Sequence, residues 1–175
     1  AIKEALGDAA TEDVLSAWGE AYGQLAEILI NAEEQVYRAN QEKPGGWRGK
    51  RGFLLTKKIR ESDVITSFYF EPVDGKPIAD FQPGQYITLI LDIDGQTVRR
   101  NYSLSDSPGK PYYRISVKRE PGGLVSNYLH DQLSVNNHIK LTAPCGDFVL
   151  NDAQRPLVLL SGGVGITPTV SMLQP

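Results

Sequence analysis

The chain has 175 residues, which is enough for one sizeable hydrophobic core and part of a second. Hydrophobic residues make up 41% of it and charged residues 22%, and the net charge is −3 at neutral pH. This balance is typical of a globular protein and excludes the strongly basic surface of a nucleic-acid binder. No apolar run approaches the roughly 18 residues of a membrane span, and the first residues lack the pattern of a signal peptide.

The first forty residues show the period of an amphipathic helix. Apolar side chains recur there at spacings of three and four: Val14, Trp18, Tyr22, Leu25, Leu29, Ala32 and Val36. Thr11 can cap such a helix, and Glu12 and Asp13 place negative charge at its positive end. The pattern therefore predicts one long helix from about Thr11 to about Arg38.

The next stretch, "NQEKPGGWRGKRG", combines Pro44 with several glycines and charges, which is typical of a linker between domains. We therefore expect four parts along the chain. The expected parts are a helical segment at 1–43, a linker at 44–51, a β domain at 52–153 and the start of another domain at 154–175.

After the linker the apolar period changes to two, which is typical of β-strands. Six short segments alternate in this way: "GFLLTKKI", "VITSFYFE", "QYITLILDI", "TVRRNYSLS", "YYRISVKR" and "HIKLTA". The tripeptides "DGK" at 74–76 and "DGQ" at 94–96 predict tight turns. Together the segments predict a mainly β fold, a six-stranded antiparallel Greek-key barrel, with one short helix in "GGLVSNYLHDQL".

The chain ends on "RPLVLLSGGVGITPTVSML" before its last two residues. An apolar strand, a glycine-rich turn and a helix in this order predict the first strand–loop–helix of an α/β nucleotide-binding domain.

The segment "VRRNYSLSD" at 98–106 carries candidate binding residues on a predicted strand. Alternation places Val98, Arg100 and Tyr102 on one face and Arg99, Asn101 and Ser103 on the other. Taken alone, this pattern favours a solvated edge strand. A guanidinium, however, suits a diphosphate, a tyrosine ring can stack on a flat heterocycle, and a serine hydroxyl can donate to a ring nitrogen. The helix that starts at "GGLVS" adds free N–H groups that suit a phosphate. Together these features favour a flavin nucleotide.

Three motifs in the same order resemble those of the ferredoxin-reductase-like flavoproteins: "RNYS", "GGLVSNYLH" and "GGVGITP". The stretch from Gly52 to Leu150 is similar throughout to the FAD-binding barrel of that family, including "PGQY" and "PCGDF". The helix "VLSAWGEAYGQLAEILINAEEQVY" resembles the last helix of a bacterial globin. A globin, an FAD barrel and an NAD domain follow one another in the flavohaemoglobins.

The resemblance implies a set of cofactor-binding residues. Arg100 would contact the FAD diphosphate, Tyr102 would cover one flavin face and Ser103 would donate to the flavin N5. Further FAD contacts are implied at Tyr86, Asn101, Gly123, Leu124, Val125 and Ser126. The nicotinamide nucleotide would lie on Gly162, Gly163, Val164, Gly165, Ile166 and Thr167, in a site that is incomplete in this chain. Without the resemblance, this glycine-rich loop is equally explained as a simple strand-to-helix turn.

Glu33, on the predicted helix, has an implied role in the haem chemistry. At about 100° per residue it lies at the margin of the apolar stripe, where it would be partly buried. The resemblance places it in a hydrogen-bond network behind the proximal haem histidine, whereas the sequence alone favours a solvated acid. His130 and His138 lack metal-ligand spacing, so we expect no metal site here and haem b only in the full-length protein. The single cysteine, Cys145, excludes an intrachain disulfide, is expected to be a packed thiol, and favours the cytoplasm.

The activity implied by the resemblance is an electron relay. NAD(P)H would reduce FAD, the electrons would pass singly to haem, and nitric oxide and oxygen would be converted to nitrate. Ser103 and Glu33 are the residues expected nearest the chemistry. Alternatives are a reductase for a separate oxygenase or ferredoxin, a non-catalytic barrel that binds a ligand, and a purely structural fragment. We expect small-molecule partners, no nucleic acid, no membrane span and self-association through the apolar helix.

Overall fold

The computed structural model describes residues 2–150 and 156–174, and it falls into two compact units, Ala1–Ala39 and Asn40–Pro175. The first unit is helical and the second contains the whole β-sheet. Each unit is described by itself below.

The first unit begins with a short helix, α1 (Ile2–Leu6), and a 3₁₀ turn (Gly7–Ala9). The long helix α2 (Glu12–Glu42) follows, and its last residues belong to the second unit. Thr11 caps it as predicted, because its Oγ1 accepts a hydrogen bond of 3.4 Å from the Val14 amide. The predicted helix is confirmed and extends one turn further than the sequence pattern suggested.

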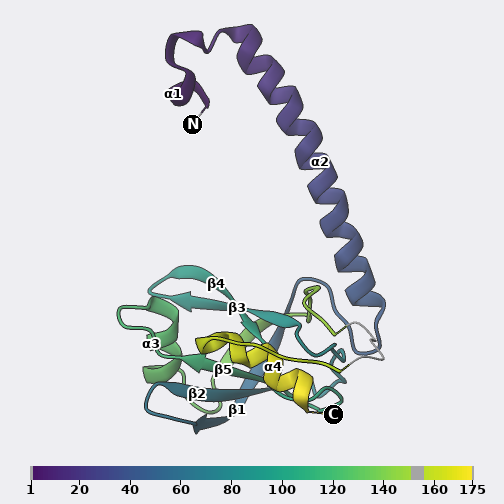
Figure 1. Ribbon diagram of the computed structural model, residues 1–175, viewed down its shortest axis with the longest axis vertical. Coiled ribbons are helices and arrows are strands. Elements are labelled where there is room, and N and C mark those ends of the chain that lie inside the picture. The colour runs from purple at the N-terminus through teal and green to yellow at the C-terminus, as the bar shows by residue number, and fades with distance from the viewer. Residues whose placement is uncertain (1, 151–155, 175) are drawn as a thin grey trace. The chain divides into compact units, whose positions relative to one another are not determined.

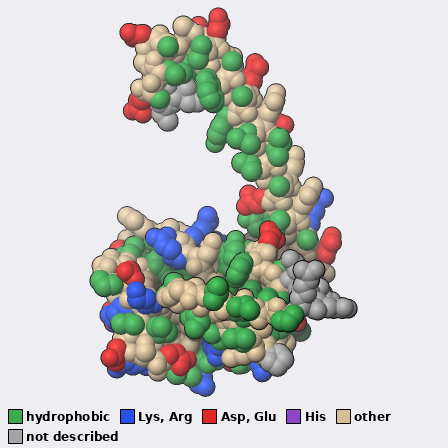
Figure 2. All heavy atoms as spheres, in the orientation of Figure 1, with side chains coloured by type: hydrophobic (Ala, Val, Ile, Leu, Met, Phe, Trp, Pro, Cys, Tyr) green, Lys and Arg blue, Asp and Glu red, His purple; other side chains and the backbone are tan. Residues whose placement is uncertain are grey.

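The apolar stripe of α2 is exposed. Trp18 is 53% exposed, Tyr22 70% and Leu29 61%, and Figure 2 shows hydrophobic side chains along the helix. The described residues of the first unit therefore leave this stripe uncovered, although exposed apolar surface of this kind is uncommon in soluble proteins.

The second unit is a six-stranded antiparallel sheet with the order β4-β3-β6-β1-β2-β5 (Figure 1). Its strands are β1 (Lys50–Arg60), β2 (Ile65–Pro72), β3 (Tyr86–Ile93), β4 (Gln96–Ser103), β5 (Tyr113–Lys118) and β6 (His138–Thr142). The turn between β3 and β4 has positive φ at Asp94 and Gly95, as the "DGQ" signal predicts. The predicted six strands are confirmed.

The sheet curls into a half-barrel around one core. Leu104, just after β4, forms an isolated antiparallel bridge with Ile115 of β5, which links the two outer strands. Alternate side chains point inward, so that Phe53, Phe68 and Leu89 are fully buried. Helix α3 (Leu124–Asp131) adds Val125 and Leu129 to the same core.

The glycine-rich segment before β1 is packed closely on the barrel. Gly45 has a φ of +71°, and a Cβ there would lie 2.5 Å from the Ile78 carbonyl oxygen. Arg51 of β1 donates to the Gly45 carbonyl of this segment at 3.5 Å, and also to the carbonyls of Lys76 at 2.9 Å and Pro77 at 3.0 Å. The Trp47 indole donates to the Leu141 carbonyl at 3.3 Å. These contacts give this segment a defined conformation instead of that of a flexible tether.

The end of the chain differs from the sequence prediction in one element. Residues 156–162 form no strand, and Leu157, Val158 and Leu160 are exposed. A strand needs a neighbour for its N–H and C=O groups, and none of the six described strands pairs with this segment. The predicted turn and helix do form, as a 3₁₀ turn (Gly163–Gly165) and α4 (Ile166–Leu173). Among the described residues, no helix is long and apolar enough to cross a membrane.

Candidate functional site

The pairing of β3 with β4 fixes the positions of the residues in the "RNYS" motif. Ser103 lies opposite Tyr86, and Tyr102 lies opposite Ile87. Val98 and Tyr102 pack against the core, as the predicted alternation requires. The motif therefore ends beside the barrel core, at the point where the chain leaves β4.

A cavity of about 440 Å³ opens at this end of β4. Its lining comes from β4, β5, α3 and the turn into α4, and comprises Asn101, Tyr102, Ser103, Ser116, Val117, Lys118, Glu120, Ser126, Val164, Gly165, Thr167 and Pro168. Residues of "RNYS", below called the flavin motif, and of the glycine-rich loop "GGVGIT" thus line one cavity, although they are about sixty residues apart in sequence. The lining residues place it between the barrel and the first turn of α4.

The structure brings together part of the predicted set and places the rest nearby. Among the predicted residues, the lining includes Asn101, Tyr102, Ser103, Ser126, Val164, Gly165 and Thr167. The others lie outside the lining: Tyr86, Arg100, Gly123, Leu124, Val125, Gly162, Gly163 and Ile166. Four of these, Arg100, Val125, Gly163 and Ile166, are sequence neighbours of a lining residue.

The Arg100 side chain is exposed and folds back onto the main chain of its own strand, β4. Its Nη1 donates to the Arg99 carbonyl at 2.7 Å. Burial raises the pKa of Tyr102, and the positive charge of Arg100 opposes that shift. The Arg100 guanidinium, which is on the same strand face as Tyr102, is thus close enough to influence the charge state of the Tyr102 hydroxyl.

Tyr86 is held from the other side by the "PCGDF" segment. Its amide and carbonyl pair with those of Cys145 at 2.9 and 3.0 Å. A Cβ on Gly146 would lie 2.9 Å from two ring carbons of Tyr86, so this position requires glycine, whose φ is +113°. A hydrogen bond with the half-buried Cys145 thiol is the main cause that raises the pKa of Tyr86. The ring is thereby fixed beside Ser103.

Helix α3 begins at the cavity, with Gly123 as its N-cap. The first intrahelical hydrogen bond runs from the Asn127 amide to the Gly123 carbonyl, so the three preceding N–H groups point out of the helix end. The Ser126 hydroxyl accepts from the Glu120 amide at 3.1 Å and therefore holds the turn. Val125 is buried in the core, so only its backbone can serve a ligand.

Five further lining residues escaped the sequence prediction: Ser116, Val117, Lys118, Glu120 and Pro168. Lys118 and Glu120 form an ion pair of 3.3 Å at the cavity. Lys118 is the last residue of β5 and Glu120 follows it before "GGLVS", in a stretch of charges that is typical of solvated surface. Only the pairing of β5 with β2 and the position of α3 reveal that they line the cavity.

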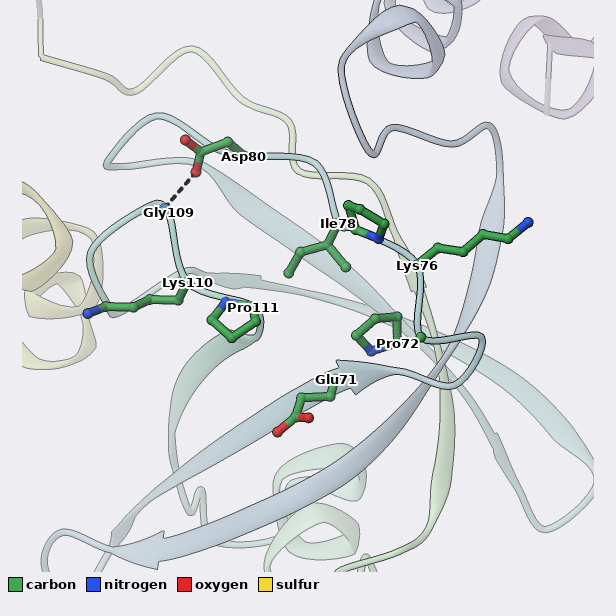
Figure 3. Close-up of a pocket in the computed structure, with 10 residues that line it drawn as sticks. Glu71, Pro72, Lys76, Ile78, Asp80, Gly109, Lys110 and Pro111 are labelled. Carbon is green, nitrogen blue, oxygen red and sulfur yellow. Dashed lines mark hydrogen bonds between the residues drawn. The ribbon is translucent and has the colours of Figure 1, made fainter.

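A second cavity, of about 590 Å³, lies away from all the predicted residues (Figure 3). The loops after β2 and before β5 line it, with Lys76 and Lys110 at its edges. The Asp80 carboxylate points toward Gly109 and accepts a hydrogen bond of 2.8 Å from its amide, which joins the two loops (Figure 3). None of the motifs contributes to this cavity, so we assign the functional site to the first.

Glu33 and the histidines have ordinary local contacts. Glu33 is exposed, instead of partly buried as expected, because nothing in the described first unit packs over it, and its Oε1 accepts from the Tyr37 hydroxyl at 2.6 Å. His130 contacts the Val117 carbonyl through Nε2 at 3.0 Å. Within residues 2–150 and 156–174, no cluster of histidine, cysteine or acidic side chains could hold a metal ion.

The site matches a flavin nucleotide in its chemistry. The cavity brings together the Tyr102 ring, the Ser103 hydroxyl, the first turn of α3 and the Lys118 ammonium group. The turn into α3 favours glycine at position 123, because a Cβ there would lie 2.6 Å from Ser126 Oγ. The half-barrel and this site together define an FAD-binding reductase domain.

Residues 53–150 match the family Oxidoreductase FAD-binding domain, and the chain belongs to that family. Over 99% of its length it is 60% identical to a flavohemoprotein of Pseudomonas aeruginosa, of which it covers 44%. It also resembles the flavohemoglobin of Malassezia yamatoensis, solved with bound FAD and heme, at 30% identity and a TM-score of 0.84, covering 98% of this chain and 45% of that one.

A further solved relative is the FAD/NAD binding domain of nitric oxide dioxygenase from Vibrio cholerae. It is 45% identical, with a TM-score of 0.68, and the match covers 70% of this chain and 55% of that chain. The chain therefore spans less than half the length of the flavohemoproteins that it matches.

Proposed function

We propose that this chain is the FAD-binding reductase part of a flavohaemoglobin, which passes electrons from NAD(P)H through FAD to haem b and so converts nitric oxide and oxygen to nitrate. The observation that carries the proposal is the shared cavity, which is lined by the last three residues of "RNYS" and by Val164, Gly165, Thr167 and Pro168. A reductase needs this juxtaposition, because the nicotinamide must meet the flavin ring. The cytoplasm is the proposed location, in keeping with the lone Cys145.

In this proposal each part of the chain has a positioning role. Tyr102 would cover one face of the flavin ring, and Ser103 would donate a hydrogen bond to N5. Arg100 and the first-turn amides of α3 would bind the diphosphate. Bound FAD would supply the chemistry, by accepting a hydride and releasing its electrons one at a time. The residues of this chain orient the ring and leave one face open to nicotinamide.

The helix before the barrel supports a flavohaemoglobin over a reductase for a separate oxygenase or ferredoxin. The similarity to flavohemoproteins includes α2, because it covers 99% of the chain. Glu33 of α2 would act on the haem through the network behind the proximal histidine, with Tyr37 as its neighbour in that network. The remaining alternative, a barrel that binds without catalysis, would not require the two motifs to line one cavity.

The proposal is tested in the full-length protein by NAD(P)H-dependent consumption of nitric oxide. The Ser103→Ala variant should retain FAD and yet show slower flavin reduction, because N5 loses its hydrogen-bond donor. Glu33→Gln should alter the haem spectrum and leave FAD content unchanged. Reduction of added ferredoxin without consumption of nitric oxide would favour the separate reductase, and a protein without flavin would overturn the proposal.

A further inference from the structure

Helix α4 is attached to the barrel by the hydroxyl group of Ser171 as well as by a side-chain contact of Met172. Ser171 is fully buried, and its Oγ donates a hydrogen bond of 2.7 Å to the main-chain carbonyl of Asp106. The next residue, Met172, packs against Gly84 of the barrel. A Cβ built on Gly84 would lie only 2.6 Å from the Met172 terminal methyl carbon. Both contacts join α4, whose first residues line the candidate site, to the barrel.

The acceptor of this hydrogen bond is itself held rigidly. Asp106 Oδ2 accepts from the Tyr112 hydroxyl at 3.1 Å and lies 3.6 Å from the Arg114 guanidinium. Arg114 also donates to the carbonyl of Ser105. The main chain at 105–106 is therefore fixed from several sides and provides a defined point of attachment for Ser171.

The same polar network reaches the wall of the cavity. The Ser105 hydroxyl, which is buried, lies 2.9 Å from Ser116 Oγ, and Ser116 lines the cavity. Ser116 in turn lies 2.9 Å from the buried Ser67 hydroxyl. Asp106 follows Ser103 by three residues, so the attachment point and the flavin motif belong to one short segment.

We propose that Ser171 is a positioning residue for hydride transfer. Its hydrogen bond to Asp106 holds α4 in place. The residues at 164–167, which lead into α4, are thereby held at the cavity opposite Tyr102 and Ser103. This inference rests on the proposed function. Ser171 itself exchanges neither protons nor electrons. The hydride that leaves NAD(P)H carries both electrons to FAD, and the geometry of that encounter depends on the turn that α4 supports.

Amide hydrogen exchange in the FAD-loaded 175-residue chain tests the attachment. Ser171→Ala should make the amides of 166–173 exchange about two- to tenfold faster, as expected for the loss of one buried hydrogen bond. Thr169→Val is the matched control, because the Thr169 hydroxyl bonds only the Ile166 carbonyl of its own helix, at 2.8 Å, among the hydrogen bonds described for it. Equal exchange in Ser171→Ala and the parent would overturn the attachment.

Rapid-mixing reduction of the full-length protein tests the consequence. With NAD(P)H, Ser171→Ala should lower the saturating rate of flavin reduction about tenfold, whereas reduction by dithionite, FAD content and melting temperature should match the parent. A merely structural role would change FAD content or the dithionite rate instead, and that outcome would overturn the inference, as would an unchanged rate with NAD(P)H. A parent that NAD(P)H does not reduce would overturn the proposed function, while the exchange experiment would still decide whether Ser171 anchors α4.

Discussion

The barrel and helix α2 carry equally regular apolar patterns, yet only the barrel buries its own. Phe53, Phe68 and Leu89 are fully buried, whereas Trp18 and Leu29 are more than half exposed. Regular spacing therefore establishes that a segment has an apolar face, and it does not establish where the partner of that face is encoded. The barrel contains the partners of its strands, and the stripe on α2 requires a partner from outside the first unit.

Core truncation should show the largest contrast between the two regions. Phe68→Ala should lower the free energy of unfolding of the barrel by about 3–5 kcal/mol, because it leaves a cavity in the core. Leu29→Ala should change it by less than about 0.5 kcal/mol, since that side chain is 61% exposed. Urea denaturation measures both values, and similar losses in the two variants would contradict the contrast.

Cofactor binding should depend on one arginine of the barrel. Arg100→Ala should weaken FAD binding by about 1.5–3 kcal/mol, because it removes a charge-assisted contact to the diphosphate. Arg99→Ala is the matched control, since it removes the same charge from the opposite strand face. Titration of the three proteins with FAD gives the affinities, and a parent-like affinity for Arg100→Ala would exclude Arg100 from the site.

The stripe on α2 should drive self-association of the 175-residue chain. Leu25→Lys combined with Leu29→Lys should weaken the association at least about tenfold, since each leucine contributes roughly 1.5 kcal/mol when buried at an interface. Asn31→Lys, on another face of the helix, should leave it unchanged. Analytical ultracentrifugation would detect the difference. A parent that is monomeric at all concentrations would remove the stripe as an interface.

Alkaline pH should destabilise the barrel through Tyr113. Burial raises the pKa of Tyr113, whose hydroxyl donates to the Ala79 carbonyl at 2.5 Å. Because the folded-state value lies above the unfolded value of about 10, stability is fully present below about pH 10 and is lost as the pH rises beyond it. Tyr113→Phe should cost about 1 kcal/mol at neutral pH and reduce the alkaline loss, as unfolding measured from pH 8 to 11 would show. The pKa values of Tyr86 and Tyr102 are also raised, so these two groups should retain part of the loss. Tyr22→Phe, on the exposed stripe, should leave the profile unchanged, and an alkaline loss as large in Tyr113→Phe as in the parent would assign it to other groups.

The elements of the fold could be predicted because each is marked locally. The six strands show a period of two, α2 shows helical spacing and a Thr11 cap, and Asp94 and Gly95 mark their turn. Residues 156–160 were predicted as a strand from composition alone, and this was wrong because a strand also needs a neighbour. Local pattern could not supply that information.

The candidate site was only partly readable from the sequence. Its motif residues carry recognisable chemistry, so Tyr102, Ser103 and Thr167 could be selected in advance. Ser116 and Ser171 could not, because a small hydroxyl residue has no distinctive pattern and its role depends on which carbonyl or hydroxyl the fold brings near. The pairing of β5 with β2 places Ser116, and the packing of α4 against the loop at Asp106 places Ser171.

The most direct test of the central claim is an equilibrium titration of the flavin-free 175-residue chain with FAD, followed by flavin fluorescence and absorption. The assignment of the cavity at the end of β4 predicts saturation at one FAD per chain, with a shifted flavin spectrum as the ring becomes covered by Tyr102. Tyr102→Ala should reduce this shift. A chain that is folded by circular dichroism and shows no saturable FAD binding would contradict the assignment of the cavity and the function built on it.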